Sequence, residues 1–142
     1  MIDRYRIVRF HRATHRIGLY LADLRALGLS QGEAHILAHL AKSSPASISQ
    51  LHRGLAHKRS TLTSILDRLV ERKLVTREVG ATDRRTFIVR PIKKGRDVAR
   101  RVHRHLTALE QAVARRVTPA EARAFLRVIA AVEEEARQHT RR

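Results

Sequence analysis

Hydrophobic residues recur every three or four positions along most of the chain, with one stretch where the pattern becomes extended instead. Residues 5–27 predict one long helix with Gly28 as its C-cap, and a second helix runs to about residue 41. Further helices are predicted over residues 94–117 and from Pro119 onward. The stripes are Phe10, Ile17, Leu21 and Leu24; Ile36, Leu37 and Leu40; Val98, Val102, Leu106, Leu109 and Val113; and Phe125, Val128, Ile129 and Val132.

Several helix starts carry the capping-box pattern, in which Ser or Thr is followed three residues later by Glu or Gln. In this pattern each side chain accepts a hydrogen bond from the other residue's backbone N–H, which satisfies donors that a helix start leaves unpaired. Pro119 also occupies a first helical position, where proline is favoured. We therefore expect helices to begin at Ser30 with Glu33, Ser47 with Gln50, and Thr118 with Glu121.

Two short helices follow a predicted loop over residues 43–46. The first has an apolar face of Ile48, Leu51 and Leu55, and the second is predicted over residues 58–73. The apolar stripe of the second helix must pack on the first, which leaves its opposite face for another partner. That stripe consists of Leu62, Ile65, Leu66, Leu69 and Val70.

The opposite face of the second helix carries hydroxyl and basic side chains. At about 100° per residue, Ser60 and Ser64 point most directly away from the stripe. Small hydroxyl groups beside arginines suit insertion into a major groove, because they reach base edges and phosphates without steric conflict. Phosphates would repel the more distal Asp67 and Glu71, so the N-terminal end should enter the groove. The residues that flank the two serines are Arg59, Thr61, Thr63 and Arg68.

From Leu74 the pattern is extended, and residues 74–79 and 86–92 predict a β-hairpin in which Phe87 packs inward. Its tip, residues 80–85, carries Asp83, Arg84 and Arg85. After a helix-turn-helix, a tip this basic favours a wing that contacts the DNA backbone or the minor groove, where arginine is attracted. Asp83 would hold a neighbouring arginine by an ion pair. An ordinary solvated hairpin is the alternative.

Composition limits the class of partner. Thirty basic and thirteen acidic residues give a formal net charge of +17, which favours DNA, RNA or an acidic membrane face. The absence of cysteine excludes disulfides, thiol-based sensing and thiolate zinc sites. No run is long and apolar enough to span a bilayer, and residues 1–4 lack the apolar core of a secretory signal. We therefore expect a cytoplasmic protein with no membrane partner, folded as one domain over residues 1–142.

These motifs resemble the winged-helix regulators of the multiple antibiotic resistance regulator (MarR) family. The resemblance implies a mainly α (α+β) fold with a winged helix-turn-helix core over residues 28–92. Residues 1–27 and 93–142 would be dimerisation helices, in agreement with apolar stripes too extensive for one small domain to cover. The segments that carry the resemblance are Ser30-Gln31-Gly32-Glu33, Leu51-His52-Arg53-Gly54-Leu55, Ser60-Thr61-Leu62-Thr63, Leu66-Asp67-Arg68-Leu69, Lys73-Leu74-Val75, Asp83-Arg84-Arg85 and Gly95-Arg96.

The resemblance implies a sequence-specific regulator that binds double-stranded DNA, with repression as the family expectation. A homodimer would place recognition helix 58–73 of each subunit in successive major grooves of a near-palindromic operator, and wing 80–85 in the minor groove. The candidate DNA-binding residues are Lys58, Arg59, Ser60, Thr61, Thr63, Ser64, Arg68, Arg77, Asp83, Arg84 and Arg85.

Other nucleic-acid and surface functions stay open at this point. A sequence-independent DNA-compacting protein is the main alternative, since a charge of +17 supports binding anywhere on DNA. RNA binding is less favoured because exposed aromatic residues are scarce. Binding to an acidic membrane surface is less favoured because the basic residues follow the winged section and not one amphipathic helix.

Relatives also bind small molecules, in a crevice between the dimerisation helices and the winged core that accepts an anionic aromatic compound. The resemblance therefore implies His11, His15, Tyr20 and His39 as effector candidates. With only 4% aromatic residues, ordinary packing is the favoured interpretation of each. Histidines four residues apart can also chelate Zn²⁺, but among so many arginines we interpret them as surface or interface residues and predict no metal site.

Catalytic motifs are absent from the sequence. It contains no Gly-rich phosphate loop, no G-x-S-x-G elbow, no H-E-x-x-H and no cysteine nucleophile. Asp83 with its two arginines is better explained by the wing, and Glu133-Glu134-Glu135 by a solvated helix face. We therefore predict a protein that is not an enzyme and needs no cofactor.

Overall fold

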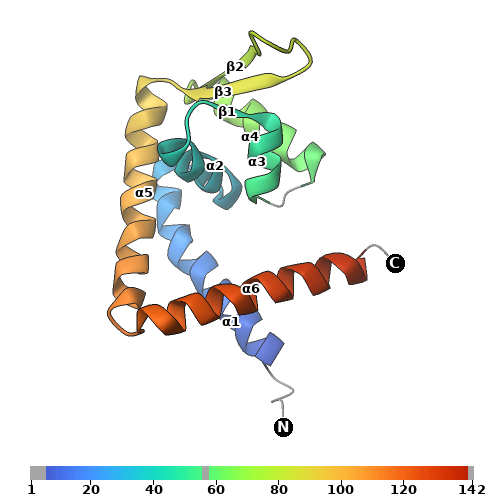
Figure 1. Ribbon diagram of the computed structural model, residues 1–142. Coiled ribbons are helices and arrows are strands. Elements are labelled where there is room, and N and C mark those ends of the chain that lie inside the picture. The colour runs from blue at the N-terminus through green and yellow to red at the C-terminus, as the bar shows by residue number, and fades with distance from the viewer. Residues whose placement is uncertain (1–5, 56–57, 141–142) are drawn as a thin grey trace. The chain divides into compact units, whose positions relative to one another are not determined.

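The computed structural model describes residues 6–55 and 58–140 and confirms a mainly helical fold with one small sheet (Figure 1). The predicted helix start at residue 5 lies outside these ranges. The chain divides into two compact units, one up to Arg104 and one from His105. The elements are α1 (Arg6–Leu21), the 3₁₀ helix η1 (Ala22–Leu27), α2 (Gln31–Lys42), β1 (Ala46–Ser47), α3 (Ile48–Leu55), α4 (Arg59–Glu71), β2 (Val75–Val79), β3 (Phe87–Pro91), α5 (Lys93–Ala114) and α6 (Pro119–Thr140).

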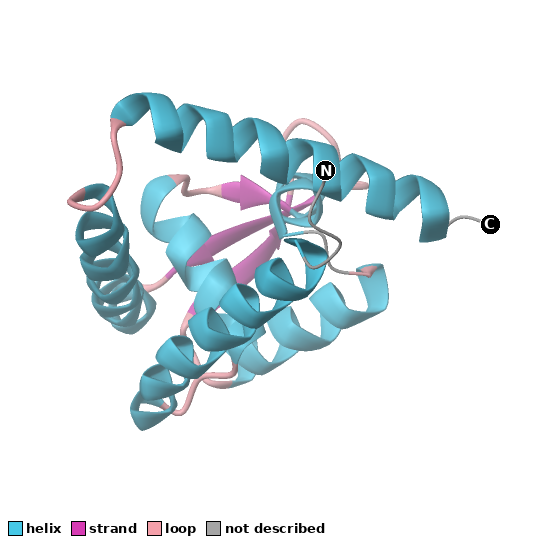
Figure 2. Cartoon of the chain, turned by 90° about the horizontal axis from the view of Figure 1, so that it is seen from below, coloured by secondary structure: helices cyan, strands magenta, loops and turns pink. Residues whose placement is uncertain are grey.

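The core of the first unit lies between the sheet and helices α2, α3 and α4, which cover the same side of the strands (Figures 1 and 2). Ile36 of α2, Leu51 of α3, Leu66 of α4 and Val89 of β3 are almost completely buried. Burying each such side chain contributes about 1.5–3 kcal/mol. These contacts fix the orientation of α4 against the core, and therefore which of its faces is exposed to solvent.

The helix predicted over residues 5–27 is not a single α-helix. The α-helix ends at Leu21 and continues as the 3₁₀ helix η1, which includes Leu24. Both are buried in the core. The predicted C-cap is confirmed: Gly28 has φ = +68°, and its N–H donates to the Arg25 carbonyl at 2.7 Å.

The sheet has the order β1-β3-β2 and is antiparallel throughout. The loop predicted over residues 43–46 was wrong at its end, because Ala46 begins the two-residue strand β1 and pairs with Val89. Such a short strand leaves no periodic signal. The predicted inward packing of Phe87 was also wrong. This side chain is 41% exposed, since it lies at the outer end of the hairpin opposite Val79.

The predicted apolar stripe of α4 is confirmed at four of its five positions. Leu62, Ile65, Leu66 and Leu69 are buried, whereas Val70 is 39% exposed. Val70 was misassigned because it stands at the edge of the stripe, about 100° from Leu69 on the helix.

The predicted capping boxes are confirmed. Ser47 and Gln50 exchange backbone-to-side-chain hydrogen bonds of 2.7 and 3.1 Å at the start of α3. Ser30 and Glu33 do so in α2. In the second unit, hydrogen bonds from the backbone and then the hydroxyl of Thr118 lower the pKa of Glu121 below its usual value.

Apolar side chains remain exposed on two helices. On α1, Ile7, Val8 and Leu19 are exposed, and on α6 Leu126 and Val128 are. Helix α6 has no buried residue. Within the described residues, no helix is both long and apolar enough to cross a membrane.

Candidate DNA-binding surface

Helix α4 presents a polar face to solvent, as its sequence predicts. It begins at Arg59 with Lys58 as N-cap residue and continues to Glu71, close to the predicted range 58–73. Packing of the apolar stripe on the core turns the other residues outward. The exposed candidates on this helix and its cap are Lys58, Arg59, Ser60, Thr61, Thr63, Ser64 and Arg68.

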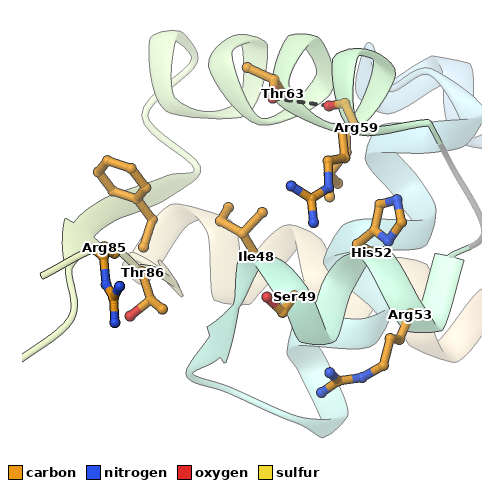
Figure 3. Close-up of a pocket in the computed structure, with 10 residues that line it drawn as sticks. Ile48, Ser49, His52, Arg53, Arg59, Thr63, Arg85 and Thr86 are labelled. Carbon is orange, nitrogen blue, oxygen red and sulfur yellow. Dashed lines mark hydrogen bonds between the residues drawn. The ribbon is translucent and has the colours of Figure 1, made fainter. Parts of the chain in front are cut away.

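Two neighbouring hydroxyl groups on this face have different hydrogen-bond roles. The Thr63 hydroxyl donates to the backbone carbonyl of Arg59 at 3.0 Å (Figure 3). The Ser64 Oγ instead accepts from Arg68 Nη1 at 3.2 Å. The Thr63 O–H is therefore used inside the helix, whereas the Ser64 O–H remains available to donate to another partner.

Arg68 is also anchored to the core, which was not predicted from the sequence. Its Nε donates to Glu33 Oε1 at 3.0 Å, and the Glu33 side chain is only 5% exposed. Arg72 donates to the other Glu33 oxygen at 3.2 Å and to the carbonyls of Gly28 and Leu27. Glu33 was predicted only as a capping residue. The four-residue spacing of Arg68 and Arg72 is the one signal that a shared acidic partner existed.

The wing tip is held in shape by Asp83. Its Oδ1 accepts from the backbone N–H of Arg85 at 2.9 Å and from Nε of the same residue at 3.4 Å, which confirms the predicted pairing. The Asp83 carbonyl accepts from the hydroxyl and the N–H of Thr86. A Cβ at Gly80 would lie 2.8 Å from that carbonyl, so the turn needs glycine. Arg84 and Arg85 are exposed at the tip.

Arg77, the remaining wing candidate, points back toward α4. Its Nη1 lies 3.2 Å from Asp67 Oδ1, and its guanidinium carbon lies 5.2 Å from the centre of the Phe87 ring. Arg77 therefore links the hairpin to α4. About one third of its side chain is exposed, so part of the guanidinium remains accessible.

A cleft of about 450 Å³ lies between α3, α4 and the wing (Figure 3). Arginines from all three segments line it: Arg53 from α3, Arg59 from α4 and Arg85 from the wing. Guanidinium and hydroxyl groups gathered in this way are the donors that proteins use for phosphate oxygens. Sequence reasoning missed the α3 contribution, although Ser49 and Arg53 lie on the side of this helix opposite Leu51. The α3 residues in the cleft are Ile48, Ser49, His52 and Arg53.

The effector candidates lie in separate places. His11 and His15 line a hollow of about 500 Å³ on α1, whereas His39 lines another of about 370 Å³ beside Gly54. Tyr20 lines neither hollow. The structure does not bring the four together in one pocket, and their role stays a prediction. Across residues 6–55 and 58–140, no three His, Asp or Glu side chains are grouped closely enough to hold a metal ion.

A helix-turn-helix with an exposed hydroxyl and arginine face, followed by an arginine-tipped hairpin, defines a winged-helix DNA-binding protein. The MarR family model matches residues 27–86. A MarR-family transcriptional regulator from Silicibacter pomeroyi is 31% identical, with 87% of this chain and 84% of that one covered and a TM-score of 0.72. The chain therefore belongs to the MarR family of transcriptional regulators, as its motifs predicted.

More distant structures share the fold. Staphylococcus aureus MepR in its DNA-binding conformation has a TM-score of 0.83 at 16% identity, with 91% of this chain and 96% of that chain covered. Bordetella bronchiseptica BpsR, whose DNA binding is regulated by 6-hydroxynicotinic acid, has a TM-score of 0.75 at 19% identity, with coverage of 94% and 96%. No curated protein sequence matches significantly.

Proposed function

We propose that this protein is a homodimeric repressor that binds a near-palindromic DNA operator, with α4 in the major groove and the wing in the minor groove. The observation that carries the proposal is that Arg59 and Thr63 of α4, beside its exposed serines, line one cleft together with arginines of α3 and the wing. Hydroxyl groups reach base edges, while the arginines neutralise the adjacent phosphates.

The exposed apolar side chains of α1 and α6 support the homodimer. Ile7 and Val8 are each more than 60% exposed, and so is Leu126. Large apolar side chains gathered on terminal helices indicate a surface that a partner covers. A second copy of the chain is the simplest partner, because a two-fold axis would also present two recognition helices about one helical turn of DNA apart.

By analogy with related proteins, we extend the proposal to repression of transcription and to release of DNA by an effector. BpsR responds to 6-hydroxynicotinic acid, so we propose that a small molecule also tunes DNA binding here, with the hollow beside His11 and His15 as the first place to look. The family consists of transcriptional regulators, and we propose that this chain has no enzymatic activity. A cytoplasmic location follows from a DNA partner.

The net charge of +17 favours one competing function, sequence-independent compaction of DNA. Selection of bound fragments from random DNA at physiological salt separates the two. A regulator enriches a near-palindrome with half-sites about 10 base pairs apart, and the mass in solution equals two copies. A pool that stays random after selection, or a mass equal to one copy, would contradict the proposal.

A further inference from the structure

Glu33 joins the start of α2 to the groove-facing helix α4. Its side chain is 5% exposed, and its oxygens accept from Arg68 Nε at 3.0 Å, from Arg72 Nη1 at 3.2 Å and from the Ser30 N–H at 3.0 Å. A carboxylate that is buried and held by three donors has one stable orientation, because hydrogen bonds to charged groups are strong where water is excluded. Glu33 is therefore a hydrogen-bond acceptor of fixed orientation on the buried side of α4.

Arg68 connects the buried Glu33 carboxylate to the exposed face of α4. The guanidinium group is planar and its donors form a rigid fork, so holding Nε also sets the direction of Nη1. Nη1 donates to Ser64 Oγ at 3.2 Å. The positive charge repels the hydroxyl hydrogen, which turns away from Arg68. Since Ser64 is exposed, its O–H faces solvent, where DNA would lie.

We propose that Glu33 is a positioning residue for sequence readout: it fixes Arg68 so that Ser64 presents a hydrogen-bond donor to one base of the operator. This inference rests on the proposed placement of α4 in the major groove. A donor selects base edges that expose an acceptor, such as the O6 and N7 of guanine or the O4 of thymine. Cytosine, which offers only its amino group there, is disfavoured because Arg68 already donates to the Ser64 oxygen.

The same anchor restrains non-specific binding. An arginine without an acidic partner on a DNA-facing helix is free to turn to the nearest phosphate, and such a contact carries no sequence information. Removing the Glu33 charge should therefore lower the preference for the operator while random-DNA affinity is kept or raised. A residue that only stabilised the fold would lower both affinities together.

The test uses the full-length protein and the DNA fragment it selects. Dissociation constants are measured for that fragment, for its single-base variants and for random DNA, with native protein, Glu33→Gln, Ser64→Ala and the double variant. Glu121→Gln is the matched control, because Glu121 caps α6 as Glu33 caps α2, while its carboxylate is held by Thr118. Arg68→Gln serves as a second probe if Glu33→Gln fails to fold, since Arg72 still holds Glu33.

We expect Ser64→Ala to reduce discrimination against cytosine at one operator position by about three- to tenfold, the value of one hydrogen bond. Glu33→Gln, or Arg68→Gln in its place, should cause the same loss at the same position, with no further loss in the double variant. An equal fall in operator and random-DNA affinity, or a change at a different position, would overturn the proposed positioning of Ser64 by Glu33 through Arg68. If the native protein shows no operator preference, the proposed function is overturned, and the positioning role of Glu33 is overturned with it.

Discussion

Arg77 on β2 lies over the ring of Phe87 on β3, with 5.2 Å between the guanidinium carbon and the ring centre. The two residues are diagonal neighbours in the hairpin, because Arg77 pairs with Val89 and Phe87 with Val79. The same guanidinium group reaches Asp67 of α4 at 3.2 Å. Arg77 thus links the wing to α4, and its guanidinium group lies over one face of the exposed Phe87 ring.

Phe87→Leu should loosen the hairpin by removing the ring face under Arg77. We expect faster amide exchange in β2 and β3, equivalent to about 0.5–1 kcal/mol for an exposed cation–π contact. Native-state hydrogen exchange measures this directly. Arg90→Gln is the comparison, because it removes an arginine of the same hairpin whose contact with Glu78 is a surface pair at 3.8 Å. Equal exchange in Phe87→Leu and native protein would rule out the role of the ring.

Gly95 and Gly18 should respond in opposite directions to alanine. A Cβ at Gly95 would lie 1.7 Å from the Leu74 carbonyl oxygen, so α5 could not keep its place against the hairpin. We expect Gly95→Ala to lower the free energy of unfolding by about 1–3 kcal/mol or more. At Gly18 the nearest atom would be 4.0 Å away, and alanine should stabilise α1 by up to about 1 kcal/mol. Urea unfolding of both variants is the measurement, and similar effects would contradict this packing.

Lys73 ends α4 in a conformation that normally belongs to glycine. Its φ is +56°, its N–H donates to the Val70 carbonyl, and the Leu74 N–H donates to the Leu69 carbonyl. This is the Schellman pattern, in which a side chain at the left-handed position is strained. Lys73→Gly should therefore raise the free energy of unfolding by about 0.5–1 kcal/mol relative to Lys73→Ala. A less stable glycine variant would show that the strain is not present.

Arg85→Ala should weaken binding without changing sequence preference. The side chain is 93% exposed and pre-ordered by Asp83, a geometry that suits an interaction with the DNA backbone or the minor groove. We expect affinity to fall on the order of tenfold for operator and random DNA alike, and the salt slope to shrink by about 1 for each phosphate that Arg85 neutralises. Titrations at several salt concentrations measure both. Arg137→Ala, which removes an arginine paired with Glu134 on α6, should leave both unchanged.

Local signals in the sequence predicted most of the fold. Capping boxes, glycine at a C-cap and the stripe of α4 depend on residues a few positions apart, and each was confirmed except at Val70. The anchor at Glu33 could not be predicted in this way, because its partner Arg68 is 35 residues distant and the pairing depends on how α2 packs against α4. The outward position of Phe87 likewise depends on a cross-strand neighbour.

The affinity ratio between a selected operator fragment and random DNA of equal length tests the central claim most directly. Measured at about 150 mM salt, it separates base readout by α4 from attraction to phosphate alone. We predict a ratio of at least about 10³. A ratio near one, with tight binding to both, would show that the charge of the chain and not its recognition helix selects the DNA.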